Sequence, residues 1–153
     1  EGIKLALKQD EKANNDGLDI CICRLEAIDK ETTHIYFTGA KRPLFYWVNS
    51  ENEIKTLVGD KRSLGGVSLK HRNFTSQELT LPVGSAIYLS TDGFADQNNP
   101  ERQKLTTIRM LDYIYEHRHL PMNEQKTALE RLLDNHQQDS PQRDDITLIG
   151  IRL

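Results

Sequence analysis

The 153-residue sequence has few cysteines and no long apolar run, and its charges nearly balance. Its 20 basic and 23 acidic residues give a formal net charge of −3, which offers no electrostatic basis for binding nucleic acid or a membrane surface. No apolar run approaches the roughly 18 residues that a transmembrane helix needs. We therefore expect a cytoplasmic location, with neither nucleic acid nor membrane among the partners of this segment.

The two cysteines, Cys21 and Cys23, lie two positions apart in the stretch LDICICRLEA. On a strand such residues project from the same face and cannot easily bridge each other. Because a lone C-x-C pair is a weak metal signal, we interpret both as small core residues. Leu18, Ile20 and Ile22 fill the alternate positions, which predicts a strand covered on both faces.

The composition, 37% apolar and 28% charged, is that of a soluble globular domain. Short polar connections such as DKET and SENE are typical of hairpins, so the sheets should be largely antiparallel, with helices on their outer faces. The predicted strands cover residues 18–28, 33–39, 44–49, 54–58, 74–81 and 85–91 and part of DDITLIGIRL, and the predicted helices cover 106–117 and 122–137.

Acidic residues stand at the ends of two predicted strands. Asp92 follows the strand in AIYLSTDGFADQ, whereas Asp144 and Asp145 precede the last strand. If these strands are antiparallel neighbours, Asp92 and Asp144 meet at one edge of the sheet. Clustered carboxylates without His or Cys suit Mg²⁺ or Mn²⁺. Gly93 would leave room for close backbone approach, and Asp96 could bind a ligated water.

Two plainer interpretations remain open on the residues alone. Asp-Gly is a common turn, and an aspartate such as Asp144 often simply precedes a strand. The basic pair Lys61 and Arg62, in GDKRSLGG, could bind a phosphorylated partner or could be an ordinary solvated loop, and the loop lacks the Walker order. The histidines show no ligand spacing and are predicted to lie on the surface: His34, His71, His117, His119 and His136.

Four blocks occur in order along the chain: GLDICICRLEAIDKETTHIYFTGAKRPLFYW, GD..SLGG, STDGFADQ and RDDITLIGIRL. This ordered set resembles the metal-dependent protein phosphatases (PPM type), in particular the bacterial SpoIIE-like branch that acts on phosphoserine or phosphothreonine. The resemblance covers residues 17–153. It implies an α+β fold, in which two antiparallel sheets form a sandwich flanked by helices, with two Mn²⁺ or Mg²⁺ ions at one end.

Carried over residue by residue, the resemblance makes Asp92 and Asp144 metal ligands and gives Gly93, Asp96 and Asp145 a role in shaping the site. It implies direct hydrolysis by metal-activated water. The family's earlier Asp-Gly motif, whose aspartate bridges both ions, has no match here, because Asp16-Gly17 aligns with the turn before LDICIC. We therefore expect residues 1–153 to be part of one phosphatase domain, with residues 1–12 ending a helix and the first quarter to third absent.

Such a partial domain is expected to bind metal weakly or not at all and to be inactive alone. The resemblance further implies a phosphorylated regulatory partner, such as an anti-sigma antagonist, and a sensor domain upstream. Omitted early elements would expose apolar surface and a sheet edge, which favours a homodimer. The alternative is a non-catalytic binding or dimerisation module that retains the phosphatase scaffold.

Overall fold

The computed structural model describes residues 17–65 and 73–153. Its helices are α2 (Gly93–Asp96), α3 (Thr107–Glu116) and α4 (Met122–Gln137). Its strands are β1 (Gly17–Leu18), β2 (Ile20–Ala27), β3 (Thr32–Ala40), β4 (Leu44–Trp47), β5 (Ile54–Leu57), β6 (Leu64–Gly65), β7 (Ser76–Pro82), β8 (Ala86–Ser90) and β9 (Leu148–Arg152).

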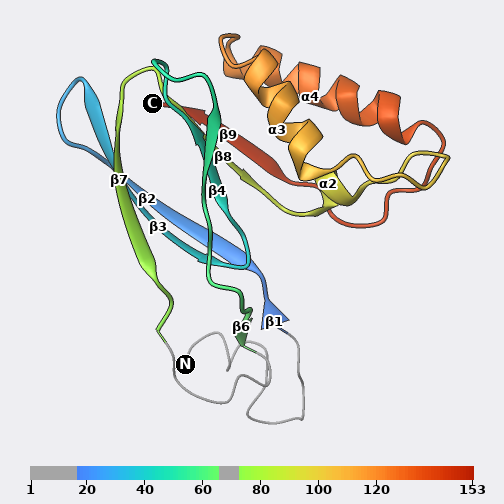
Figure 1. The fold of residues 1–153 in the computed structure, drawn as a ribbon, viewed down its shortest axis with the longest axis horizontal. Helices are drawn as coiled ribbons and strands as arrows, with labels where there is room; N and C mark the ends of the chain where they lie inside the picture. The colour runs from blue at the N-terminus through green and yellow to red at the C-terminus, as the bar shows by residue number, and fades with distance from the viewer. Residues whose placement is uncertain (1–16, 66–72) are drawn as a thin grey trace.

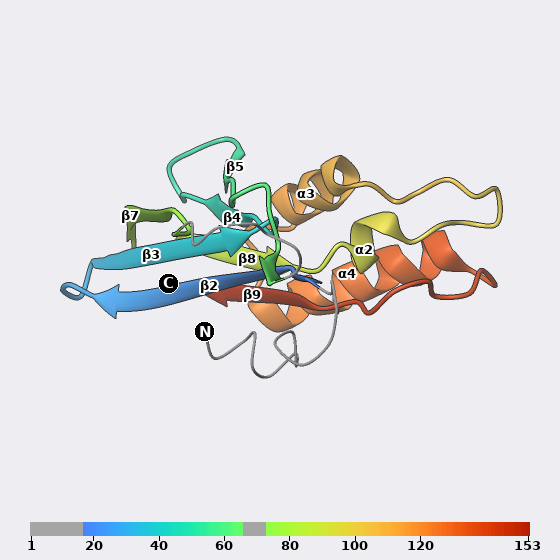
Figure 2. The ribbon, with the colours of Figure 1, turned by 90° about the horizontal axis from the view of Figure 1, so that it is seen from below.

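The strands form two main antiparallel sheets. One sheet has the order β2-β3-β7 and the other β5-β4-β8-β9, while β1 and β6 form a separate short pair. Figures 1 and 2 show the three-stranded sheet on one side of the four-stranded sheet and the helices on its other side. The expected α+β sandwich is confirmed, although every helix of the described part packs on the four-stranded sheet.

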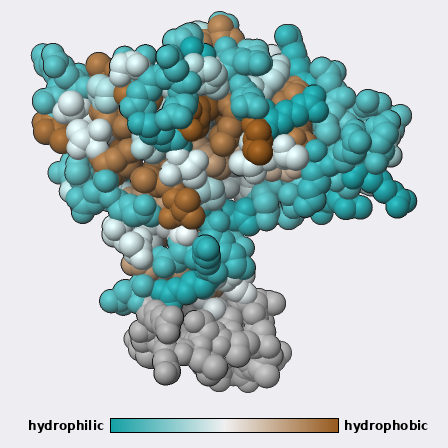
Figure 3. Space-filling model, in the orientation of Figure 1, coloured by the Kyte–Doolittle hydropathy of each residue, from teal (hydrophilic) through white to brown (hydrophobic). Residues whose placement is uncertain are grey.

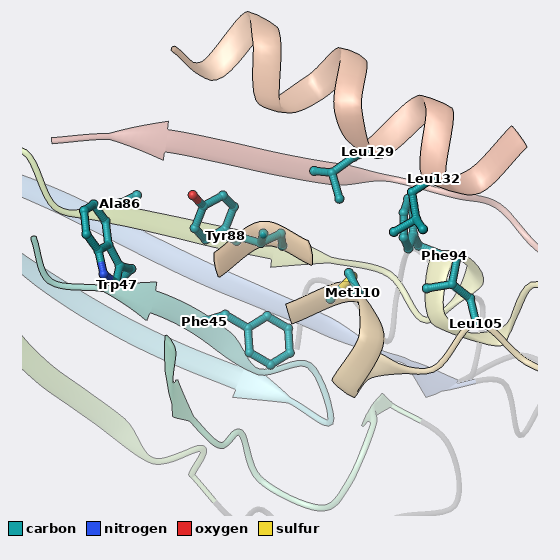
Figure 4. Close-up of a cluster of buried hydrophobic side chains, with 10 residues drawn as sticks. Phe45, Trp47, Ala86, Tyr88, Phe94, Leu105, Met110, Leu129 and Leu132 are labelled. Carbon is teal, nitrogen blue, oxygen red and sulfur yellow. The ribbon is translucent and has the colours of Figure 1, made fainter. Parts of the chain in front are cut away.

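Alternating side chains of the four-stranded sheet supply both core layers. Leu44 and Ile87 belong to the cluster between the two sheets, together with Ile35 and Phe37 of β3. Side chains of the opposite face form the second cluster with the helices (Figure 4), and its buried members are Phe45, Trp47, Ala86, Tyr88, Phe94, Leu105, Met110, Ile114, Leu129 and Leu132. The sheet that carries β8 and β9 is therefore fixed from both sides, which makes its ends a rigid support for functional side chains.

The two longer helices match their predicted ranges to within one residue. The Thr106 side chain accepts a hydrogen bond from the Arg109 backbone N–H at 3.3 Å and caps the start of α3. The buried face of α4 follows the helical repeat, with Gln125, Leu129, Leu132 and His136 toward the core. No helix in the described ranges is long and apolar enough to cross a membrane.

A buried hydrogen bond joins α4 to the four-stranded sheet. The Tyr88 hydroxyl donates to Gln125 Oε1 at 2.8 Å, and Gln125 Nε2 donates to the Arg118 and Leu120 carbonyls at 3.2 and 2.8 Å. Tyr88→Phe leaves Gln125 Oε1 buried without this donor, so we expect a loss of about 1–2 kcal/mol in the free energy of unfolding. Urea denaturation followed by far-UV circular dichroism measures this loss. An unchanged midpoint would contradict the assigned bond.

The structure corrects two predictions about the surface. Cys21 and Cys23 face the cluster between the sheets, as predicted. The pKa of Cys23 is raised to about 11, mainly by burial and to a smaller extent by the neighbouring Cys21. The opposite face of their strand is open, because Ile22 is 61% exposed. His136 is buried rather than on the surface, and its Nε2 lies 3.2 Å from the Gln97 carbonyl. The expected helix end at 1–12 and His71 lie outside the described residues.

Candidate functional site

The ends of β8 and β9 that carry acids are adjacent. The two strands are antiparallel neighbours, with Ser90 opposite Leu148, which is the condition that the sequence analysis set for Asp92 and Asp144 to meet. Thr91 continues the pairing past the strand end, because its N–H donates to the Thr147 carbonyl at 3.0 Å and its hydroxyl donates to the Asp145 carbonyl at 2.9 Å. The segments that hold Asp92 and Asp145 are therefore joined at one edge of the sheet.

Gly93 makes this approach possible. A Cβ atom at position 93 would lie 2.5 Å from the Asp145 carbonyl oxygen, a distance that real Cβ atoms do not reach. The glycine is buried and begins α2, so the chain turns into the helix directly beneath the Asp145 backbone. Gly93 therefore lets the start of α2 approach the Asp145 backbone, while its role in shaping a metal site remains a prediction.

Asp92 occupies the N-cap position of α2 without acting as a side-chain cap. An aspartate at this position ordinarily accepts a hydrogen bond from the first turn of the helix. Here the Asp92 carboxylate, 48% exposed, instead accepts a hydrogen bond from Arg42 Nη2 at 2.6 Å. Its oxygens therefore point to the cluster around Arg42 and are not used to start the helix.

The other predicted acids are exposed around this edge and have separate partners. Asp144 Oδ1 accepts a hydrogen bond from the Asp145 N–H at 2.7 Å. Asp96 forms an ion pair with Lys104 at 3.0 Å. The structure thus brings the Asp144 and Asp145 segment to Asp92, whereas Asp96 is engaged elsewhere on the helix surface.

Arg42 connects Asp92 to a second acid, Asp19. The guanidinium lies 3.5 Å from Asp19 Oδ2, and Lys41 lies 3.4 Å from Asp19 Oδ1. Burial alone would raise the pKa of Asp19, but the Ser63 hydroxyl and the charges of Lys41 and Arg42 outweigh it and lower the pKa. Burial opposes the charge of Arg42 as well, yet Asp92 and then Asp19 raise the pKa of the guanidinium. Each charge in this cluster is stabilised by a neighbour of opposite sign.

Tight backbone packing fixes the turn that carries Arg42. Lys41 has a φ of 59°, and the Lys41 N–H donates to the Asp60 carbonyl at 2.7 Å. A Cβ on Gly39 would overlap the Arg42 carbonyl oxygen, and one on Gly59 would lie 2.7 Å from the Gly39 carbonyl oxygen. Two backbone segments, 39–42 and 59–60, therefore meet without side chains between them, which leaves little freedom for the base of Arg42.

The predicted substrate-binding pair lies in the next loop. Lys61 is exposed, whereas Arg62 is partly buried and donates to the Asn73 carbonyl at 2.7 Å. The Arg62 guanidinium also stacks on the Phe74 ring at 4.3 Å. Ser63, two residues after Lys61, donates to Asp19, so this loop reaches the same cluster as Arg42.

The sequence prediction missed Arg42 and Asp19. A signal for part of this cluster was present, because the hairpin register pairs Ile20 with Ala40 and so sets Asp19 across from Lys41. Opposite charges facing each other across antiparallel strands attract. The contact between Arg42 and Asp92 joins residues 50 positions apart, Arg42 two residues before β4 and Asp92 two residues after β8. It follows from the antiparallel pairing of β4 with β8, in which Leu44 lies opposite Leu89, and the sequence analysis did not predict that pairing.

The donors at this edge fit a hard divalent cation in kind but not in number. Carboxylate oxygens are the ligands that Mg²⁺ and Mn²⁺ prefer, and Mg²⁺ requires six in near-octahedral geometry. Within residues 17–65 and 73–153 no group of three or more acidic, His or Cys side chains is arranged to hold a metal ion. Asp92 and Asp144 would therefore provide part of a metal site.

A family model for stage II sporulation protein E (SpoIIE) matches residues 5–153. The chain belongs to the SpoIIE family. Its fold agrees with this membership, because the solved structures that it resembles are phosphatase domains of the PP2C and SpoIIE type. No curated protein matches the sequence of this SpoIIE-family chain.

The SiaA-PP2C domain of Pseudomonas aeruginosa is 33% identical over 78% of this chain and 46% of its own length, with a TM-score of 0.69. The phosphatase domain of the cell fate determinant SpoIIE from Bacillus subtilis is 11% identical, covers 98% of this chain and 63% of its own, and has a TM-score of 0.57. The manganese-presoaked form of that domain is 13% identical, and the match covers 100% of this chain and 66% of that domain, with a TM-score of 0.54. The chain therefore spans less than two thirds of these solved domains.

Proposed function

We propose that the protein containing this chain is a metal-dependent protein serine/threonine phosphatase. The observation that supports this most is the junction of the Asp92 and Asp144 segments, held by Thr91 and made possible by Gly93, in a chain of the SpoIIE family. The manganese-presoaked structure of the B. subtilis SpoIIE domain, whose fold this chain shares, favours Mn²⁺ as the ion to test first.

In this proposal Asp92 and Asp144 hold the cation, and Gly93 and Asp145 keep their backbones together. Bound Mn²⁺ or Mg²⁺ supplies positive charge for the phosphate and lets water act as the nucleophile at neutral pH. Phosphoserine or phosphothreonine is hydrolysed directly, without a phosphoenzyme. Lys61, exposed on a loop that reaches the same cluster, is positioned to contact the phosphorylated partner, and Arg62 supports that loop through Asn73 and Phe74.

We propose that residues 1–153 on their own are inactive. Two acids, one of them ion-paired with Arg42, supply fewer ligands than two Mg²⁺ or Mn²⁺ ions require. The remaining donors would come from a part of the domain outside this chain, which the larger size of the solved relatives allows for. The direct test is release of phosphate from a phosphoserine peptide by the full-length protein with Mn²⁺ and after chelation. Equal release with and without metal would reject a metal-dependent activity.

The partners follow from the same proposal. We infer a phosphorylated regulatory protein, such as an anti-sigma antagonist, as the substrate and a sensor domain as the controlling element, in the cytoplasm. Of these assignments, family membership supports only the phosphoserine or phosphothreonine class of the substrate. Phosphoprotein profiling of cells with and without the gene would test the substrate class, and an unchanged phosphoserine pattern would count against it.

One observation favours a second function, that of a non-catalytic module on the same scaffold. The Asp92 carboxylate forms an ion pair with Arg42 at 2.6 Å, so this acid has a cationic partner without any metal. A scaffold that has lost catalysis would retain the fold and its docking surfaces. Metal-independent binding of a partner, with no phosphate release by the full-length protein at saturating Mn²⁺, would establish this alternative.

We also expect self-association through the open apolar surface. Ile22 on β2 and Ile149 on β9 are 61% and 48% exposed, and each lies on a strand at the edge of its sheet. Figure 3 shows apolar side chains gathered among polar ones on the body of the molecule. Unpaired edges with apolar side chains favour pairing between copies. Multi-angle light scattering of residues 1–153 should give a mass above 17.6 kDa that falls for Ile149→Lys, and a wild-type monomer at high concentration would contradict this.

A further inference from the structure

An arginine already holds the carboxylate that the proposed function assigns to a metal. Arg42 Nη2 lies 2.6 Å from Asp92 Oδ2, which is the separation of a short, charge-assisted hydrogen bond. The Arg42 side chain is only 18% exposed, so solvent screens this pair less than it would an ion pair on the open surface. A cation that binds Asp92 through the same oxygen must displace the guanidinium.

The cluster gives Arg42 a second partner once Asp92 is taken. Asp19 Oδ2 lies 3.5 Å from the same Nη2 atom, and Asp19 is held in place by the Ser63 hydroxyl. A partly buried guanidinium that lost every partner would be strongly destabilised. Because Asp19 remains, Arg42 can leave Asp92 without becoming an isolated charge. The base of Arg42 stays where it is, since Gly39 and Gly59 pack against the backbone of its turn.

We propose that Arg42 is an internal competitor for the Asp92 carboxylate and sets the affinity of the site for divalent cations, with Asp19 as the alternative partner of Arg42. This inference rests on the proposed function, because it takes Asp92 to be a metal ligand. Metal and guanidinium compete at Asp92 because both bind the same carboxylate and their positive charges repel. Occupancy of the metal site is therefore linked to the position of one side chain.

The neighbouring residue Lys41 offers a matched control. It carries the same charge, but the acid with which it forms its ion pair, at 3.4 Å, is Asp19 and not Asp92. If only the net charge near the site mattered, neutralising Lys41 or Arg42 would change metal affinity similarly. If Arg42 competes at Asp92, the two variants differ. A variant at Asp19 gives a further test. Of the two acids that form ion pairs with Arg42, it removes Asp19 and leaves Asp92, so Arg42 should compete more strongly with the metal for Asp92.

The experiment is a Mn²⁺ titration of the full-length protein, read by isothermal calorimetry and by the electron paramagnetic resonance signal of free Mn²⁺, with no substrate present. Arg42→Gln should bind Mn²⁺ about fivefold to tenfold more tightly than wild type, as removal of a partly buried competing ion pair predicts. Lys41→Gln should change the affinity less than about twofold, and Asp19→Asn should weaken it about threefold. Arg42→Lys, which retains the charge but not the planar fork, should lie between wild type and Arg42→Gln.

The outcomes separate this inference from the proposed function. Equal Mn²⁺ affinity in wild type and Arg42→Gln, with Asp92→Asn still losing Mn²⁺, would overturn the competitor role and leave the phosphatase proposal standing. An equal gain in Lys41→Gln and Arg42→Gln would also overturn it. Mn²⁺ binding that Asp92→Asn does not weaken would reject both. If Arg42→Gln does not fold, as judged by circular dichroism, the comparison of Arg42→Lys and Asp19→Asn decides, because the competitor role requires shifts of opposite sign.

Discussion

Asp92→Asn is expected to abolish Mn²⁺-dependent hydrolysis of a phosphoserine peptide by the full-length protein, with a loss of at least about a thousandfold in rate. That factor corresponds to about 4 kcal/mol of transition-state stabilisation, which is within the range that a metal ion supplies to a developing phosphate charge. An asparagine has nearly the same shape but no charge, so it is a weak ligand for Mn²⁺. Initial rates of phosphate release at saturating Mn²⁺ measure the effect.

The fold should survive this substitution. The Asp92 side chain makes no capping bond to α2 and is 48% exposed, so its charge contributes little to the stability of the helix. The asparagine oxygen can still accept a hydrogen bond from Arg42. Thermal unfolding within about 2 °C of wild type would establish that the loss of activity is chemical.

Asp144 provides a second variant for the same test, and Asp112 provides a control. Asp144→Asn should cause a loss of similar size, and the double variant should be little worse than either single one, because both acids serve one site. Asp112→Asn removes an exposed carboxylate from α3 and should leave the rate unchanged. Retained hydrolysis in Asp92→Asn, or a loss shared by Asp112→Asn, would remove Asp92 from the site.

The sequence was informative where a local pattern determines the structure. The ranges of α3 and α4 follow from apolar residues at helical spacing, and α4 was predicted at its observed bounds. The sequence analysis reasoned that Asp92 and Asp144 meet if the strands beside them are antiparallel neighbours, and the structure shows that β8 and β9 are such neighbours. The metal role of the acids at this edge remains a prediction, because nothing in the described residues tests it.

The prediction failed where the structure depends on contacts between distant segments. The pairing of Arg42 with Asp92 depends on β4 lying beside β8, and no local spacing in the sequence reveals that strand pairing. His136 looked like a surface residue, yet it faces the core because α4 turns that side toward the Gln97 loop. Ile22 was predicted to be covered because β2 has apolar residues on both of its faces. Its side chain is 61% exposed, and no described element packs over it. The short helix α2 was not among the predicted helices, since four residues carry no helical period.

Gly93→Ala is expected to lower the free energy of unfolding by about 2–3 kcal/mol and to weaken Mn²⁺ binding to the full-length protein about tenfold. The added methyl group would lie 2.5 Å from the Asp145 carbonyl oxygen and 3.1 Å from the Ile146 side chain, so the backbone of the Asp145 segment must move. Gly93 is not among the glycines with positive φ, so this cost is steric and does not come from an unfavourable dihedral angle. Alanine also favours a helix over glycine by about 1 kcal/mol, which opposes part of the loss.

Gly150→Ala is the matched control for Gly93→Ala. It adds the same atom within β9, but there the nearest neighbours are the Met122 sulfur and the Tyr88 ring, each at 3.3 Å, and both are side chains that can shift. We expect this variant to lose less than about 1 kcal/mol and to bind Mn²⁺ like wild type. Urea unfolding and Mn²⁺ calorimetry on both variants separate a general packing defect from a defect at the acid edge. Unaltered Mn²⁺ affinity in Gly93→Ala would show that the approach of Asp92 to the Asp145 segment is not what assembles a metal site, since that contact is the one the substitution forces apart.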